Sequence, residues 1–308
     1  MSSASSNSNA LATGRVVAGH GRHFVVEGPD GQRLICHPRG KKSECVVGDH
    51  VQWKPTGDSS GEGVIERVEP RRNLLFRQDE WRAKSFAANI DQLLVLVATD
   101  PSFSESQLAR ALIAAESAKI PVRIVLNKVE LPQAQAARAR LAPYLAMGYA
   151  VTEVSLTAHR EEAAATLAPL FQAKATLVLG PSGAGKSTLI NLMVPSAAAQ
   201  VGEISQALQS GKHTTTSTQW YWVDHAQGTA LIDSPGFQEF GLRQIEAREL
   251  AAFMPDIRDA AAACRFYNCT HLHEPGCGVI AAAEAGSIHP SRYRIYDELF
   301  QELSSRRY

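Results

Sequence analysis

The sequence has no long apolar segment, no excess of charge of either sign and little cysteine. Its longest apolar runs, such as residues 93–98, are far shorter than the roughly 20 residues that a membrane helix needs. Lysine plus arginine equals aspartate plus glutamate at 31 each, so a nucleic-acid partner must be met by local patches of charge. Residues 1–9 are almost all serine and asparagine and lack the cationic, apolar pattern of an export signal. We therefore expect a soluble, cytoplasmic protein without a membrane partner, with a disordered tail over residues 1–13.

The five cysteines are an odd number, which disfavours a disulfide framework. Three of them, Cys264, Cys269 and Cys277, fall close together with His271 between them. Three thiolates and one imidazole form a complete tetrahedral set for one structural Zn²⁺, with no position left open for catalysis. His273 is an alternative fourth ligand, and incidental core thiols are the alternative to a metal site.

Short β-type runs broken by Gly, Pro and Asp fill residues 14–77. The runs are residues 15–18, 23–27, 33–36, 50–53 and 64–68. Five short strands at this spacing predict a small β barrel.

Apolar runs alternate with Ala-rich helical stretches from residue 89 onward. The predicted strands are residues 93–98, 122–126, 150–155, 176–179 and 229–232. This alternation predicts a mostly parallel α/β sheet in a domain spanning residues 78–241. Residues 242–308 are typical of helices interrupted by the cysteine cluster, with Ser291 as a candidate cap of a final helix running toward Ser304.

The pattern G-x-x-x-x-G-K-S occupies residues 180–187, between an apolar strand and an apolar-periodic helix that begins at Lys186. Its glycines let backbone N–H groups curl round phosphate oxygens, and the positive end of the helix points at them. Lys186 is expected to reach the β and γ phosphates, and Ser187 to ligate Mg²⁺. Asp233, at the end of a later strand, is expected to hold that ion from the other side. The alternative is a chance Gly-rich turn.

Asn127-Lys128-Val129-Glu130 follows a predicted strand, where α/β nucleotide-binding proteins place ligand-contacting loops. GTPases carry Asp at the fourth position, whose carboxylate accepts two hydrogen bonds from guanine. Glu130 offers the same acceptors on one more methylene, whereas adenine would present an acceptor to it. A simple strand-end turn is the alternative for the motif, and Ser155 is either a neighbour of the base or a turn serine.

The interval between the phosphate loop and Asp233 is where GTPases keep their first switch, and residues 211–216 fall within it. One threonine there could close over Mg²⁺ and the γ-phosphate, although a merely polar loop is the alternative. Gly236 is expected to offer its amide to the γ-phosphate. Phe237 stands where many GTPases carry a water-orienting Gln, so we expect slow intrinsic hydrolysis and hypothesise that His213 supplies the missing polar group.

The expected site residues are thus shared among four segments of the chain. Those expected to bind GTP are Asn127, Lys128, Val129, Glu130, Ser155, Gly180, Pro181, Ser182, Gly183, Ala184, Gly185, Lys186, Ser187, Thr188, Asp233 and Gly236. The switch threonines are Thr214, Thr215 and Thr216. The base-reading motif precedes the phosphate loop, which is the reverse of the order in ordinary GTPases.

With its motifs in this order, the chain resembles the ribosome small-subunit-dependent GTPase A (RsgA) family. Members of that family have a circularly permuted GTPase domain between an N-terminal OB barrel and a C-terminal zinc domain. The resemblance rests on Val47-Gly48-Asp49-His50-Val51, Asn89-Ile90-Asp91-Gln92, Asn127-Lys128, the phosphate loop, residues 211–216, Asp233-Ser234-Pro235-Gly236-Phe237 and residues 264–277. Glu130 and Asn268 replace the family's usual Asp, and Lys212 its usual Arg; only Glu130 bears on a chemical role.

The resemblance implies an OB barrel over residues 14–77, a permuted P-loop GTPase domain over 78–241 and a zinc-binding helical domain over 242–308. It also implies a GTP hydrolase that uses Mg²⁺ with GTP, binds the small (30S) ribosomal subunit and its rRNA, is stimulated by it and helps to release assembly factors. We expect a monomer. The alternatives are an RNA-binding assembly module with a nucleotide switch but little hydrolysis, and an ATPase.

Local clusters of basic residues are consistent with an RNA partner. The alternative is that they are ordinary solvated surface residues. The basic residues are Arg33, Arg39, Lys41, Lys42, Arg71, Arg72, Arg77, Arg82 and Lys84. Phe24 and Trp53 are candidate aromatic platforms for bases. Because the segment after Gly236 leads into the cysteine cluster, we also predict that γ-phosphate contact repositions the C-terminal domain relative to the barrel.

Overall fold

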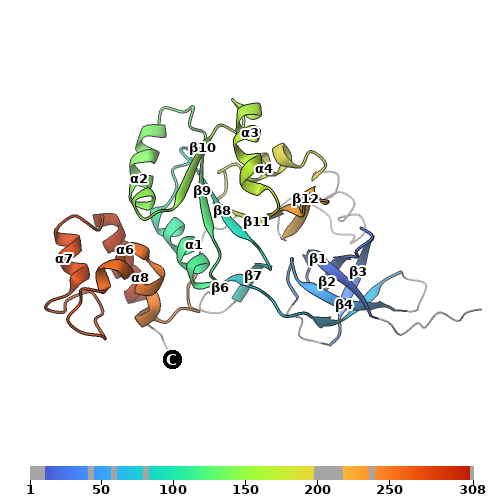
Figure 1. Ribbon diagram of the computed structural model, residues 1–308, viewed down its shortest axis with the longest axis horizontal. Helices are drawn as coiled ribbons and strands as arrows, with labels where there is room; N and C mark the ends of the chain where they lie inside the picture. The colour runs from blue at the N-terminus through green and yellow to red at the C-terminus, as the bar shows by residue number, and fades with distance from the viewer. Residues whose placement is uncertain are drawn as a thin grey trace, which may run out of the picture.

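The computed structural model describes residues 11–40, 45–56, 61–78, 83–197, 218–235 and 240–305. An N-terminal barrel and a C-terminal group of helices lie at opposite ends of the molecule, and an α/β domain lies between them (Figure 1). Among these described residues, no helix combines the length and the apolar character needed to cross a membrane.

The N-terminal part is a closed barrel, as the sequence predicts. Its strands are β1 (Ala12–His20), β2 (His23–Glu27), β3 (Arg33–Pro38), β4 (His50–Pro55) and β5 (Gly63–Val68). They pair in the order β1-β2-β3-β5-β4, and β1 closes the barrel against β4. The first strand begins at Ala12, before the predicted run 15–18 and inside the predicted tail of residues 1–13, because Ala12 and Thr13 pair with β4.

A hairpin that the sequence analysis does not predict, β6 (Leu74–Gln78) with β7 (Ala83–Ala88), follows the barrel. Gly48 of the barrel lies so close to it that a Cβ there would be 2.1 Å from the Ala88 carbonyl oxygen. The Asn89 side-chain amide donates to the Gly48 carbonyl at 3.0 Å. These contacts fix the barrel to the entrance of the α/β domain.

The central sheet has the order β10-β9-β8-β11-β13-β12. Its strands are β8 (Gln92–Ala98), β9 (Val122–Asn127), β10 (Ala150–Val154), β11 (Ala175–Leu179), β12 (Gln219–Asp224) and β13 (Thr229–Asp233). All neighbours are parallel except β12, a strand that the sequence analysis does not predict, which runs antiparallel to β13. One pair, Gln219 with Ala18 of β1, continues the sheet into the barrel.

Helices cover both faces of this sheet. They are α1 (Glu105–Ser117), α2 (Ala134–Ala146), α3 (Arg160–Phe171) and α4 (Lys186–Met193). Apolar side chains of α1 and α2 join one core cluster, and those of α3 and α4 join the other. This is the doubly covered, mostly parallel arrangement that the alternating sequence pattern predicts.

The C-terminal part is helical, as predicted: η1 (Ala247–Phe253), α6 (Pro255–Ala261), α7 (Gly278–Glu284) and α8 (Pro290–Ser304). The predicted cap of the last helix is wrong, because His289, not Ser291, caps α8 by accepting from the Ser291 N–H. Arg110 of α1 forms a bidentate pair with Glu302 of α8. Part of the domain is thereby fixed to the α/β core.

Candidate functional site

The carboxyl ends of the parallel strands border a cavity of about 420 Å³. It is lined by Asn127, Lys128, Thr157, Ser182, Gly183, Gly185, Lys186, Ser187, Thr188, Asp233 and Ser234. Most of the residues predicted from the phosphate loop and the Asn-Lys motif therefore meet at one place. This edge of an open α/β sheet is where such folds bind nucleotides.

The phosphate loop connects β11 to α4, and α4 begins at Lys186 as predicted. A Cβ at Gly180 would lie 2.3 Å from the Leu96 carbonyl oxygen, so glycine is needed for the loop to pass β8. Gly185 has a φ of 106° and caps α4 without a side-chain hydrogen bond, which leaves the first-turn N–H groups available. Free N–H groups at the positive end of a helix are suited to binding phosphate.

Three charged residues line this cavity: Lys128, Lys186 and Asp233. The Lys186 ammonium donates to the carbonyl oxygens of Gly180 at 2.7 Å and Pro181 at 3.0 Å. Burial lowers the pKa of Lys186, and Asp233 opposes that shift. Burial likewise raises the pKa of Asp233 to about 6, against the effects of Lys186 and the Ser234 N–H.

The Asp233 carboxylate also shows whether the site suits a cation. Its Oδ1 atom is buried and has no hydrogen-bond partner within the described part of the chain. A buried carboxylate oxygen without a partner is unfavourable unless a ligand satisfies it. Because Ser187 lines the same cavity and also offers oxygen, the two residues fit the hard, oxygen-preferring Mg²⁺.

Asn127 links the loops around the cavity. Its side-chain amide donates to the Ala184 carbonyl of the phosphate loop at 2.9 Å, and its Oδ1 accepts from the Leu156 N–H at 3.1 Å. Lys128, with a φ of 65°, donates from Nζ to the Asp100 carbonyl at 2.5 Å. The predicted base-reading loop is therefore joined both to the phosphate loop and to the loop after β10.

Other predicted base contacts lie differently. Glu130 is exposed and is not among the residues that line the cavity in the described structure. Ser155 is buried, and its hydroxyl accepts from the Ala158 N–H at 3.3 Å in a turn. Thr157 and Ser234 also line the cavity and are not predicted from the sequence; their position just after a strand end is the signal that could have found them.

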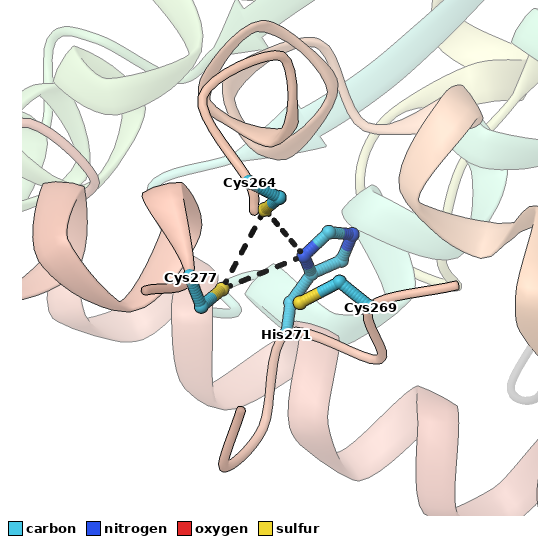
Figure 2. Close-up of side chains that lie close together, drawn as sticks. All are labelled: Cys264, Cys269, His271 and Cys277. Atoms are coloured by element: carbon cyan, nitrogen blue, oxygen red, sulfur yellow. Dashed lines mark hydrogen bonds between the residues drawn. The ribbon is translucent and has the colours of Figure 1, made fainter. Parts of the chain in front are cut away.

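A second cluster lies in the helical part, where Cys264, Cys269, His271 and Cys277 point toward one another (Figure 2). Their ligand atoms all lie within 4.8 Å of one another. The Cys264 and Cys277 sulfurs are 3.8 Å apart, and His271 Nδ1 is 3.4 Å from the Cys264 sulfur and 3.6 Å from that of Cys277.

These separations test whether the cluster fits zinc. Tetrahedral ligands with Zn–S bonds of about 2.3 Å stand about 3.8 Å apart, which matches the sulfur–sulfur distance. His271 belongs to the cluster, whereas His273 is exposed and lies outside it. The residues present therefore fit one Zn²⁺ in a closed, fully protein-ligated site.

Several predicted residues fall outside the described residues. These are His213, Thr214, Thr215, Thr216, Gly236, Phe237, Lys41, Lys42 and Arg82. Phe24 and Trp53 are described, and their assignment as exposed base platforms is wrong. They are 6% and 8% exposed and belong to the barrel core, because their strand positions face inward.

Several of the basic residues predicted to contact RNA form ion pairs with acidic residues of the protein itself. Arg71 forms a bidentate ion pair with the fully buried Asp49. Arg33 pairs with Glu27, and Arg39 with Glu66. Arg71 and Arg33 thus have structural partners, while Arg39 remains largely exposed at 74% of its side chain.

The order of these elements is that of a permuted GTPase, and the sequence model of the family described as RsgA GTPase matches residues 68–243. The chain belongs to the RsgA GTPase family. A relative named small ribosomal subunit biogenesis GTPase RsgA, from Variovorax paradoxus, is 61% identical and the match covers 99% of this chain and 96% of the relative. The RsgA of Burkholderia pseudomallei is 51% identical, with coverage of 95% and 93%.

Solved structures agree with RsgA membership. YjeQ from Thermotoga maritima matches with a TM-score of 0.71 at 30% identity, covering 96% of this chain and all of that one. YloQ, described as a circularly permuted GTPase, matches with a TM-score of 0.70 at 26% identity, covering 99% and 100%. The predicted fold class, with a β barrel, a permuted GTPase domain and a C-terminal helical region, is confirmed.

Proposed function

We propose that this RsgA-family GTPase binds the small (30S) ribosomal subunit and its rRNA, hydrolyses GTP faster when bound, and acts late in maturation of that subunit by coupling hydrolysis to release of assembly factors. The observation that carries the proposal is the cavity in which Lys186, Asp233 and Asn127 meet. Relatives that match along nearly the whole chain carry the name small ribosomal subunit biogenesis GTPase.

In this function the phosphate loop binds the triphosphate. The first-turn N–H groups of α4 and the Lys186 ammonium stabilise the β and γ phosphates. Ser187 and Asp233 would hold Mg²⁺, which supplies charge neutralisation at the phosphate oxygens. Asn127 keeps the base-reading loop against the phosphate loop, so that both ends of the nucleotide are bound by one connected unit.

Base selection and hydrolysis involve residues whose roles are proposals. Glu130, with Lys128 beside it, accepts hydrogen bonds from the guanine edge when the nucleotide is bound. His213 positions the attacking water, since Phe237 has no polar group with which to do so. One of Thr214, Thr215 and Thr216 contacts Mg²⁺ and the γ-phosphate.

The cysteine cluster holds one structural Zn²⁺ in this proposal. Cys264, Cys269, His271 and Cys277 complete its coordination, so the ion has no open position and takes no part in hydrolysis. The protein acts as a monomer in the cytoplasm, where the ribosome is assembled.

Co-sedimentation with purified ribosomal subunits tests the ribosomal part of the proposal. We expect the full chain to pellet with small subunits when a non-hydrolysable GTP analogue is present and to pellet less with GDP. Large subunits serve as the control particle, and Lys186→Ala as the control for nucleotide dependence. Equal pelleting with both kinds of subunit, or none with either, contradicts the proposal.

A further inference from the structure

The barrel and the nucleotide-binding domain meet along β12, the antiparallel edge strand of the central sheet (Figure 1). Gln219, at the start of β12, is paired on one side with Ala18 of the barrel and on the other with Asp233. One residue therefore separates the barrel from the Asp233 carboxylate, which fits Mg²⁺. A displacement of β12 would change its contacts with both β1 and β13, because closely packed interiors transmit strain.

A second contact between β12 and the barrel lies further along the strand. Trp222 donates its indole N–H to Glu27 of β2 at 2.6 Å, across 195 residues of sequence. Glu27 is buried, pairs with Arg33 at 2.7 Å and lies 3.5 Å from His225 Nε2, just beyond the end of β12. A buried carboxylate with charged and N–H partners is a directional contact, unlike apolar packing.

Aromatic side chains strengthen the same contact. The Arg15 guanidinium of β1 lies 4.5 Å from the ring centre of Trp220 and 5.2 Å from that of Trp222. Trp220 and Trp222 therefore face the barrel, whereas Tyr221 between them faces the core of α3 and α4. The alternation makes β12 a strand with one side in each domain.

The contact also contains unsatisfied donors. Within the described residues, Arg15 Nε, Gln219 Nε2 and Trp220 Nε1 are buried without a hydrogen-bond partner. A buried donor without an acceptor costs free energy, so an arrangement that gives these groups partners is favoured by that amount. The interface between β12 and the barrel therefore has the properties expected of a strand that adopts two arrangements.

We infer that Glu27 and Trp222 form the joint through which the barrel acts on the nucleotide site, and that both are positioning residues for subunit-stimulated GTP hydrolysis. This inference rests on the proposed function. When RNA binds the barrel, the resulting displacement is transmitted from β2 through Trp222 to β12. Gln219 of β12 then transmits it to Asp233. Neither Glu27 nor Trp222 lines the nucleotide cavity, so they act on the reaction through β12.

The test compares Trp222→Phe, which removes the N–H and keeps an aromatic ring, with Glu27→Gln in the full-length protein. Glu66→Gln is the matched control, because Glu66 is a barrel carboxylate whose partners Arg39 and Lys54 also belong to the barrel. Thermal unfolding of each variant shows that it is folded. Hydrogen exchange of residues 12–27 is measured with GDP and with a non-hydrolysable GTP analogue.

We expect the wild type and Glu66→Gln to show a nucleotide-dependent difference in exchange there. The two joint variants should reduce it about fivefold or more, the lower end of usual coupling between sites. At saturating small subunits their hydrolysis rate should fall about tenfold, while the rate without subunits stays within about twofold of wild type.

Unchanged exchange and an unchanged stimulated rate in both variants would overturn the inference. So would an equal fall of the basal rate, or a wild type whose barrel exchange is the same with GDP and the analogue. If small subunits fail to stimulate the wild type but its exchange difference still depends on Trp222, the proposed function fails and the joint stands.

Discussion

The side-chain amide of Asn127 donates to the backbone carbonyl of Ala184 at 2.9 Å, across 57 residues, and so joins the base-reading loop to the phosphate loop. In an unpermuted GTPase these loops occur in the opposite order along the chain. In this chain the hydrogen bond joins the two loops although their order along the chain is reversed.

Asn127→Ala should weaken binding of both GTP and GDP, because the Ala184 carbonyl and the Leu156 N–H lose their partner. Leaving buried groups unpaired should also lower the free energy of unfolding by about 1 to 3 kcal/mol. Fluorescent-nucleotide titration and denaturant unfolding measure the two effects. The control is Asn73→Ala, which removes two hydrogen bonds to Ile90 away from the cavity. Equal nucleotide affinity in the two variants would contradict the linking role.

The raised pKa of Asp233, about 6, predicts a pH dependence of Mg²⁺-nucleotide binding. Below that pH the carboxyl is protonated and cannot hold the cation, so affinity should fall by up to about tenfold per pH unit. Titration with Mg²⁺-GDP between pH 5 and 8 measures it, and Mg²⁺-free GDP is the reference. A Mg²⁺ contribution that is constant across this range would rule out the assignment.

The same shift has a consequence for stability without nucleotide. Because the folded-state pKa lies above the ordinary value of 3.8, folding is favoured when Asp233 is protonated, and this contribution is lost as pH rises through about 6. Asp233→Asn should therefore stabilise the nucleotide-free protein at pH 8 by about 3 kcal/mol while abolishing the Mg²⁺ dependence of binding. Denaturant unfolding at pH 4 and pH 8 measures the gain, which should be small at pH 4 and full at pH 8, because it develops between the two pKa values of 3.8 and about 6.

Glu130 is predicted to select guanine even though it is exposed in the described structure. Glu130→Ala should lower GTP affinity by about tenfold and leave ATP affinity unchanged, because guanine presents two donors to the carboxylate whereas adenine presents an acceptor. Glu130→Asp, which restores the usual family residue, should retain guanine selectivity. Competition of ATP and GTP for the site measures the ratio. ATP displacing GTP at similar concentration in the wild type would show that Glu130 does not select the base.

Zinc should be present at one ion per chain and should stabilise the helical domain alone. Cys269→Ser, or removal of the metal by a chelator, should increase hydrogen exchange in α7 and α8 without changing nucleotide affinity. Cys45→Ser, which alters a thiol outside the cluster, is the control. A nucleotide affinity that falls with the zinc content would show that the cluster supports the GTP site directly.

The chemistry of the site was predictable because phosphate and metal binding require particular residue types at fixed spacing. The phosphate-loop pattern, the helix start at Lys186 and the cluster of Cys264, Cys269, His271 and Cys277 are predicted in this way. Contacts between distant segments have no such signal: the hydrogen bond between Trp222 and Glu27 spans 195 residues. The burial of Phe24 and Trp53 depends on which side of the barrel each strand residue faces. The short β-type runs in the sequence do not determine which residues face inward.

The predicted movement of the C-terminal domain remains a prediction. Phe240 stacks on Phe86 at 5.6 Å between ring centres, and Leu242 pairs with Gln78 of β6. The chain after Gly236 therefore meets the β6–β7 hairpin before it enters the helical domain. Distances between labels on the barrel and on α8 test the movement; equal distances with GDP and with a GTP analogue, both free and ribosome-bound, would refute it.

The most direct test of the central claim is phosphate release from GTP by the full-length protein, with and without purified small ribosomal subunits. We predict slow release alone and a rate at least about tenfold higher with saturating subunits, since a partner that completes the site supplies the missing catalytic contact. Lys186→Ala should abolish both rates. Identical rates with and without subunits would contradict the account of this protein as a subunit-stimulated GTPase.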